Sequence, residues 1–249
     1  MKKDTVTVYW APHSTASDDG IGNWNMLYED PQTLFKYWTQ FGIKEEPEAS
    51  MIQCPAFQNI SKNTYVFNSP IDTSYSFEAQ SRLAHQIELK PQTKEYLSAF
   101  IQRNQTMSVG PSMELSLRLH MFAEEPLEIM LTGPYMHKTE YTKSGVLSSG
   151  QFDIGQWFRP INCEIQLFGQ TGQIDFKKDE PLFYIKFLTN KKVELKRFEL
   201  TEELDTYARK CINAKSIYGL RRPLNFYYDK FMKTRTRDIV LKKIKENLI

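Results

Sequence analysis

The stretch from residue 151 to 160 gathers side chains that could do chemistry at close spacing. Asp153 supplies a carboxylate, Arg159 a guanidinium group, and Trp157 a large indole between them. Pro160 biases Arg159 towards extended backbone, so the segment is expected to form a turn that leads into a strand. An acid and a base this close either pair with each other, which would fix the turn, or contact a ligand. Both alternatives stay open, and Asp153, Trp157 and Arg159 are candidate binding residues.

Histidine is the second source of candidate chemistry, and the chain contains His13, His85, His120 and His137. A jelly-roll enzyme would hold a metal ion with two histidines and a carboxylate. His120 together with His85 or His137 would have to supply that site. However, no histidine is followed two positions later by Asp or Glu. His120 falls on the polar face of a predicted strand, where solvation is the more common state, so we expect no metal and no cofactor.

No other catalytic pattern stands out. The sequence has no Gly-x-Ser-x-Gly motif and no glycine-rich phosphate loop. Cys54, Cys163 and Cys211 are too widely spaced for a zinc motif or a disulfide framework. We therefore expect reduced thiols and favour a function without catalysis.

Composition predicts a globular protein. The chain has 249 residues, of which 41% are hydrophobic and 25% charged. Its formal net charge of +2 argues against a surface that is wholly a nucleic-acid footprint. The start of the chain has no apolar signal segment, and no apolar run reaches the roughly 18 residues of a membrane span. We expect a protein that is neither secreted nor membrane-spanning.

Hydrophobic periodicity predicts a mainly β domain over residues 1–200. Residues 112–121 and 161–167 alternate strictly, as half-buried strands do, while 182–188 are apolar on both faces. Residues 112–121 and 127–131 are expected to pair as an antiparallel hairpin. Eight to ten short strands predict an antiparallel β-sandwich or jelly roll. Among the remaining segments we expect strands at 51–57, 63–67 and 82–90, a helical turn within 92–106, and a bulge in the strand at 193–200.

Helices are expected at two places. Asp30 followed by Pro31 is typical of a helix start, and apolar residues at helical spacing continue to residue 41. The second place is a C-terminal helical extension over residues 201–249, packed on the β domain. Thr201 is its predicted cap, because its hydroxyl can accept a hydrogen bond from the first turn.

The C-terminal extension is basic. From residue 221 onward it carries nine Lys or Arg against three Asp or Glu, a net charge of +6, which leaves about −4 on the first 220 residues. These cations could bind phosphate backbones, since aromatic residues lie among them. The favoured alternative is a docked helix with a solvated basic face, and a third is a contact between subunits of an oligomer. The candidate residues are Arg221, Arg222, Lys230, Lys233, Arg235 and Arg237.

Several segments resemble proteins encoded by tailed phages of marine bacteria, cyanophages in particular. They are residues 24–31 (Trp-Asn-Met-Leu-Tyr-Glu-Asp-Pro), 54–57 (Cys-Pro-Ala-Phe), 62–66 with 69–72 (Lys-Asn-Thr-Tyr-Val and Ser-Pro-Ile-Asp), and 152–160. The resemblance implies a viral protein that acts in the cytoplasm of an infected host or in the virion. It brings no catalytic residues with it, and the segments mix apolar anchors with turn residues as a fold skeleton does.

Three functional hypotheses follow. The first is a non-enzymatic phage protein that acts through protein contacts, with copies of itself, other virion proteins or a host protein. The second is a jelly-roll metalloenzyme that uses His120. The third is an accessory protein that binds nucleic acid through its basic tail.

Overall fold

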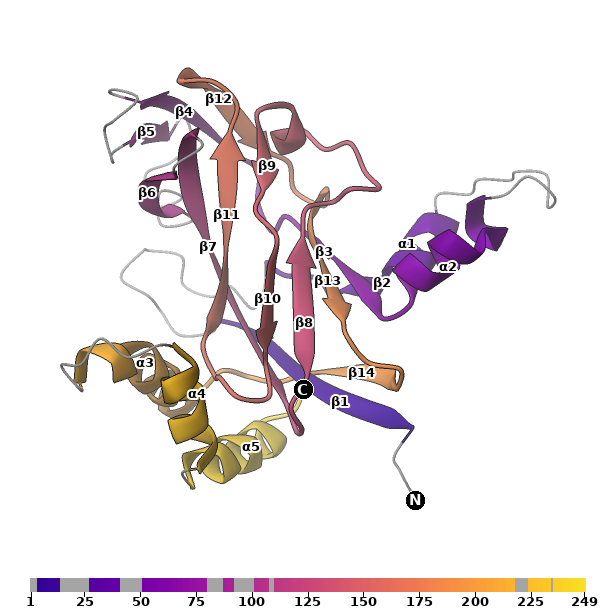
Figure 1. The fold of residues 1–249 in the computed structure, drawn as a ribbon, viewed down its shortest axis with the longest axis vertical. Coiled ribbons are helices and arrows are strands. Elements are labelled where there is room, and N and C mark those ends of the chain that lie inside the picture. The colour runs from indigo at the N-terminus through magenta and orange to yellow at the C-terminus, as the bar shows by residue number, and fades with distance from the viewer. Residues whose placement is uncertain are drawn as a thin grey trace.

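The computed structural model describes residues 4–13, 27–40, 51–79, 87–91, 101–107, 110–217, 224–233 and 235–249. These residues form a mixed α/β fold with three sheets, one of them curled into a half-barrel. Helices of the C-terminal region lie on one side of the sheets, and a small helical lobe projects from the other side (Figure 1). The predictions of a β-rich body and of C-terminal helices are confirmed. The predicted architecture of two purely antiparallel layers is too simple, because the structure has three sheets and one parallel strand pair.

The largest sheet contains both ends of the β-rich body. Strands β1 and β14 pair in parallel, from Thr5 opposite Lys192 to Trp10 opposite Arg197. This parallel pair departs from the expected antiparallel architecture. The strand order is β14 (Lys192–Arg197), β1 (Thr5–Pro12), β7 (Gly110–Ala123), β11 (Pro160–Leu167) and β9 (Gly145–Leu147), with β6 (Ile101–Met107) also paired to β7.

Two further sheets complete the body. The second has the order β10 (Gly150–Asp153), β8 (Glu128–Thr132), β13 (Pro181–Phe187), β3 (Thr64–Asn68) and β2 (Gln32–Thr33). The third has the order β12 (Thr171–Phe176), β4 (Thr73–Ala79) and β5 (Ile87–Pro91). A short 3-10 helix, η4 (Tyr141–Lys143), precedes β9.

The predicted hairpin of residues 112–121 and 127–131 is wrong. Strand β7 belongs to the largest sheet, and β8 belongs to the second, where it pairs with β10 and β13. The chain crosses from one sheet to the other after Ala123. Alternation showed correctly which face of each strand carries the apolar side chains of the first core, but these two faces meet across the core instead of lying side by side. The expectation that β7 is only half-buried is wrong, because Ser112, Ser116 and His120 on its polar face are buried as well.

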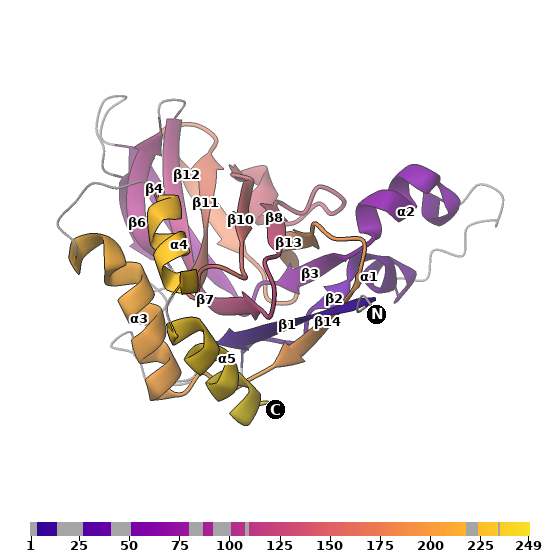
Figure 2. The same cartoon turned by 60° about the horizontal axis from the view of Figure 1, so that its bottom comes forward.

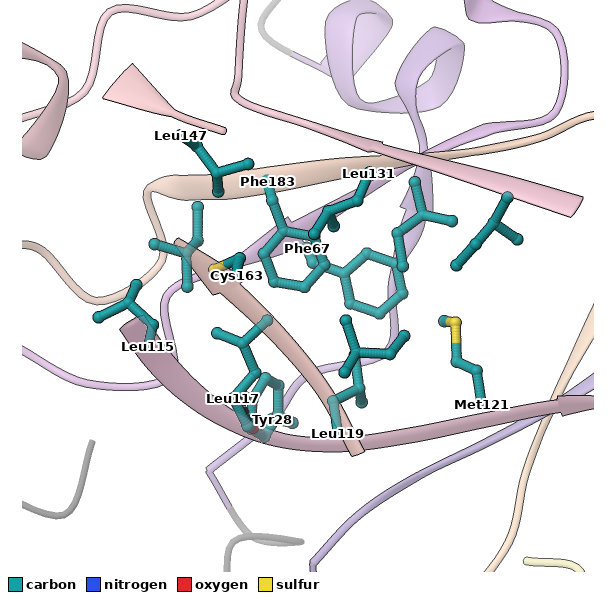
Figure 3. Packing of buried hydrophobic residues seen from close by; sticks show 14 of the residues in the cluster. Tyr28, Phe67, Leu115, Leu117, Leu119, Met121, Leu131, Leu147, Cys163 and Phe183 are labelled. Atoms are coloured by element: carbon teal, nitrogen blue, oxygen red, sulfur yellow. Dashed lines mark hydrogen bonds between the residues drawn. The ribbon is translucent and has the colours of Figure 1, made fainter. Parts of the chain in front are cut away.

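All three sheets enclose one hydrophobic core. Leu115, Leu117 and Leu119 of β7 point from the largest sheet towards the second, as Figure 3 shows. Phe67 of β3 stacks on Phe183 of β13, with ring centroids 4.9 Å apart. The predicted alternation is confirmed in β11, and β13 is buried on both faces as expected. Because β13 is nearly all apolar, it has no face suited to water.

The N-terminal helix begins later than predicted. Helix α1 (Leu34–Gln40) follows the short strand β2, and the Thr33 hydroxyl accepts a hydrogen bond from the Lys36 backbone at 3.2 Å. Asp30 does not cap this helix. Instead its carboxylate pairs with Arg197 at 3.2 Å.

Other segments changed type. Residues 51–57, predicted as a strand, form the 3-10 helix η2 (Met51–Gln53) and the start of α2 (Pro55–Ser61). Proline suits the first helical position because its fixed φ fits the helix and its missing N–H needs no partner there. Residues 101–107 form β6 where a helical turn was expected, and residues 92–100 lie outside the described part. The strands predicted at 63–67 and 82–90 correspond to β3 and, where described, to β5.

The C-terminal helices build a second core on the outer face of the largest sheet. They are α3 (Glu202–Ile217), α4 (Leu224–Lys233) and α5 (Thr236–Glu246), and Figure 2 shows them grouped against β7 and β1. The Thr201 hydroxyl accepts from the Leu204 backbone at 3.4 Å, which confirms the predicted cap. At the end of β14 the apolar residues change from one face of the chain to the other. Val193 therefore packs in the first core and Phe198 in the second. None of the described helices is long and apolar enough to cross a membrane.

Candidate functional site

Asp153 fixes the point where the chain crosses between sheets. Its Oδ1 accepts hydrogen bonds from the backbone N–H groups of Leu127 at 2.8 Å and Gly155 at 2.7 Å. Its Oδ2 accepts from the side chain of Gln156 at 2.7 Å. The carboxylate is therefore used by the two crossing segments, as a turn-forming aspartate often is.

The hypothesis of a buried pair between Asp153 and Arg159 is wrong. Among the described residues no ion pair joins them, and the Arg159 Nε approaches the carbonyl oxygen of Pro160 at 3.5 Å. Trp157 is 5% exposed and belongs to the second core. The stretch that the sequence marked as candidate chemistry thus contributes an apolar anchor and a turn.

Gly155 allows the two crossing segments to touch. A Cβ atom at this position would lie 2.2 Å from the carbonyl oxygen of Glu125 and 2.7 Å from the Cα of Pro126. Both contacts are with backbone, which cannot move aside as a side chain can. A glycine is required here because the two backbones meet.

Arg237 of α5 ties the C-terminal helices to this junction. Its Nε donates to the Gly155 carbonyl at 3.3 Å, and its terminal nitrogen donates to the carbonyls of Ala123, at 3.3 Å, and Glu124. The guanidinium carbon lies 5.7 Å from the centroid of the Phe122 ring. This candidate for phosphate binding is occupied within the protein.

Two more tail cations contact acidic residues of the chain. Lys243 pairs with Glu203 of α3 at 2.5 Å, and Lys245 pairs with Glu124 at 2.8 Å. These contacts support the docked-helix interpretation of the basic tail. Arg221 and Arg222 lie outside the described residues. The candidates that remain exposed are Lys230, Lys233 and Arg235.

His120 is buried, although its strand position suggested solvation. It is 1% exposed, and its ring lies 6.2 Å from that of His13 and 5.7 Å from that of Phe158. Within the described structure neither ring nitrogen takes part in a hydrogen bond. Burial, reinforced by the neighbouring His13, lowers the pKa of His120 from 6.5 to about 3. The imidazole is therefore neutral at ordinary pH.

A buried pair beside His120 was missed by sequence reasoning. His13 Nε2 lies 3.2 Å from Asp205 Oδ1, and Asp205 Oδ2 accepts from Arg209 Nε at 2.6 Å. Burial acts to raise the pKa of Asp205, but the hydrogen bonds and charges of His13 and Arg209 together hold it below its ordinary value. The partners are 192 positions apart, so no local motif could have signalled the contact.

His137 lies in a separate aromatic cluster on the second sheet. Its ring centroid is 4.9 Å from that of Tyr37 and 5.5 Å from that of Trp38, and its Nδ1 contacts the hydroxyl of Tyr184. Burial lowers its pKa. His85 lies outside the described residues. The predicted grouping of His120 with His137 is not formed, and no set of three His, Cys, Asp or Glu within the described ranges is placed to hold a metal ion.

The buried polar pair is better suited to docking than to catalysis. A His–Asp pair can orient a general base, but the base must reach the substrate. His13 follows β1 and is 4% exposed, and Asp205, in the first turn of α3, is 5% exposed. Their contact therefore joins β1 to the C-terminal helices.

The lobe on the other side of the body exposes apolar side chains. Of the residues of α2, Phe57 and Ser61 are buried, so most of this helix faces solvent. Phe35 of α1 is 45% exposed, Met51 of η2 38% and Ile60 of α2 37%. These three side chains give a projecting element apolar surface that a protein partner could cover.

Comparisons of the chain with protein-family models, with curated protein sequences and with solved structures found no match. The likeness of its segments to phage-encoded proteins stays a prediction.

Proposed function

We propose that this chain is a phage-encoded, non-enzymatic protein that acts through contacts with other proteins, as a virion component or a host-interaction factor. The phage origin is supported by the four resembling sequence segments. For the body we propose a sandwich whose two walls are the sheets of β7 and β13, with the third sheet closing one end. The expected compartment is the host cytoplasm or the virion.

The observation that carries the proposal is the projecting lobe of α1, η2 and α2. The lobe projects from the β body on the side opposite the C-terminal helices (Figures 1 and 2). Its inner face packs on the second sheet, where Leu34 and Tyr37 of α1 form a buried cluster with residues of β3 and β13. A helix of seven residues gains little stability alone, since helix formation needs tertiary packing or a longer run. A lobe that shows Phe35, Met51 and Ile60 to solvent has apolar area available to bury against a partner.

A nucleic-acid-binding role is the second candidate, and specific contacts weaken it. Arg237, Lys243 and Lys245 each contact an oxygen of this same chain. Lys242 pairs with Glu246 at 3.7 Å. Lys233 and Arg235 remain exposed and could still contact phosphates. This candidate predicts binding that falls steeply with salt.

The test is a matched pair of substitutions on exposed phenylalanines. Phe35→Glu places a charge on the lobe, and Phe168→Glu places the same charge on a residue that is 55% exposed between β11 and β12. Tagged proteins would be recovered from infected cells, and their co-purifying proteins quantified. We expect Phe35→Glu to lose a partner that wild type and Phe168→Glu retain. Equal recovery by all three proteins, with unchanged melting temperatures, would contradict the proposal.

A further inference from the structure

The buried histidine His120 lies at the seam between the largest sheet and the C-terminal helices. Phe122, two residues further along β7, belongs to the same face of the strand and packs against Phe231 of α4, with ring centroids 6.1 Å apart. Phe158 packs against the His120 ring from the segment before β11, at 5.7 Å. The helices therefore cover the face of β7 that carries His120, and within the described structure neither ring nitrogen has a hydrogen bond.

The groups around His120 oppose a further positive charge at the seam. His13, which follows β1, and Arg118 of β7 lower the pKa of His120, while Asp205 of α3 raises it. The Asp205 carboxylate is already shared, because it contacts His13 Nε2 at 3.2 Å and accepts from Arg209 Nε at 2.6 Å. The titratable and charged groups at this point of the seam are His13, Arg118, Arg159, Asp205, Arg209 and Cys211.

The C-terminal helices form a unit that can leave the sheet without unfolding it. They follow β14 in the chain, and their side chains pack in the second core, which shares no residue with the first. Among the described residues, their strand-like pairing with the sheet is limited to the bridge between Phe198 and Leu248 and its flanking hydrogen bonds. Local opening of such a unit takes less free energy than unfolding of the whole chain.

Opening changes the proton affinity of His120. Histidine is the side chain whose charge ordinarily changes between pH 5 and pH 8. When the helices move away, water reaches the ring, and its pKa returns from about 3 towards the ordinary 6.5. Below pH 6.5 the opened form therefore binds more protons than the docked form, so acid favours the opened form.

We propose that the helices α3, α4 and α5 open transiently from the largest sheet while the three sheets stay folded, and that mild acid promotes this opening. The opened form uncovers the apolar surface of Phe122, Trp157 and Phe158 beneath the helices. The inference does not depend on the proposed function, because it concerns the side of the body opposite the lobe (Figures 1 and 2). With the docked and opened pKa of His120, the opening equilibrium constant rises about thirtyfold from pH 7.5 to pH 5.

The test measures thiol labelling of the two buried cysteines in the intact protein. Cys211 of α3 lies in the second core and reports on the helices, whereas Cys163 of β11 lies in the first core and reports on the sheets. Cys54 is exposed, so Cys54→Ser removes it from the assay. The reagent is a dipyridyl disulfide, which reacts with thiols in acid, and each rate is divided by that of the urea-unfolded protein at the same pH.

We expect Cys211 to be labelled faster than Cys163 at pH 5, and its normalised rate to rise about thirtyfold from pH 7.5 to pH 5. His120→Leu should remove this rise, because the variant has no proton acceptor at that position. His137→Leu is the matched control, since His137 is a partly buried histidine in the aromatic cluster of the second sheet, and it should keep the rise.

Equal normalised rates for the two cysteines would overturn the inference, because the helices would then leave only when the whole chain unfolds. A Cys211 rate that does not rise in acid, or that rises equally in His120→Leu, would overturn it as well, since His120 would not drive the opening. If His120→Leu does not fold, the comparison of Cys211 with Cys163 in the protein that keeps His120 still decides.

Discussion

His120 makes the stability of the protein depend on pH between 3 and 6.5. The folded protein keeps this imidazole neutral until its pKa of about 3, whereas the unfolded chain takes up the proton near 6.5. Below 6.5 the unfolded state therefore binds more protons, and the free energy of unfolding falls as the pH falls. The difference of about 3.5 pH units, at about 1.4 kcal/mol each, amounts to about 5 kcal/mol when fully developed at low pH. At pH 5 only the interval from pH 6.5 down to pH 5 contributes, about 1.5 pH units, so the free energy of unfolding is lowered by about 2 kcal/mol.

The assay compares wild type with His120→Leu by urea unfolding at pH 7.5 and pH 5. Leucine fills the site with an apolar side chain and removes the two buried ring nitrogens that lack hydrogen bonds. We therefore expect the variant to be at least as stable as wild type at pH 7.5. Because the two proteins differ only at position 120, the difference between their unfolding free energies reports what this side chain contributes. That difference should grow by about 2 kcal/mol in favour of the variant as the pH falls to 5.

A difference that stays constant between the two pH values would refute this reasoning. It would mean that the folded protein protonates His120 freely, through water or a partner that relieves its burial. An NMR titration of the His120 ring protons gives the same answer directly, because they should not shift between pH 7.5 and pH 5.

Three further predictions concern the crossing junction and the tail. Gly155→Ala should cost several kcal/mol or prevent folding, because the new Cβ would meet backbone at 2.2 Å, whereas Gly150→Ala, with nothing within 4 Å, should leave the melting temperature nearly unchanged. Arg237→Met should speed hydrogen exchange throughout α5, since it removes bonds to carbonyls of the junction, and Lys242→Met on the exposed face should not. Single-stranded DNA should bind weakly at 150 mM salt, measured by fluorescence anisotropy, because Arg237 and three lysines of α5 contact oxygens of this same chain. Tight binding that Lys233→Ala with Arg235→Ala abolishes would favour the nucleic-acid candidate.

The sequence predicted which faces are buried far better than it predicted which strands pair. Alternation in β7 and β11 and the apolar run of β13 depend on local periodicity, which is fully visible in the chain. Pairing depends on where the chain turns. The chain crosses to another sheet after Ala123 because Asp153 and Gly155 contact the crossing segment there, from about 30 positions further along the sequence. Local periodicity carries no information on such distant contacts. The sequence therefore could not show that residues 127–131 belong to a different sheet from residues 112–121.

Chemistry-bearing residues were predicted least well, for the same reason. Asp153 and Arg159 looked like partners because they are close in sequence, but the Asp153 carboxylate is taken by backbone N–H groups. His13 and Asp205 looked unrelated and form a buried pair. The alternation of β7 placed His120 on the polar face of the strand, where solvent was expected. That face is instead covered by helices that begin about 80 positions later in the sequence.

Whether the lobe binds another protein is tested most directly by hydroxyl-radical footprinting of the protein alone and in the assembly recovered from infected cells. Met51 and Phe35 report on the lobe, and Phe168 is an exposed reference between β11 and β12. We expect the lobe residues to be oxidised in the free protein and protected in the assembly, with Phe168 modified equally in both. Equal modification of all three residues in both samples would contradict a lobe that works by protein contact.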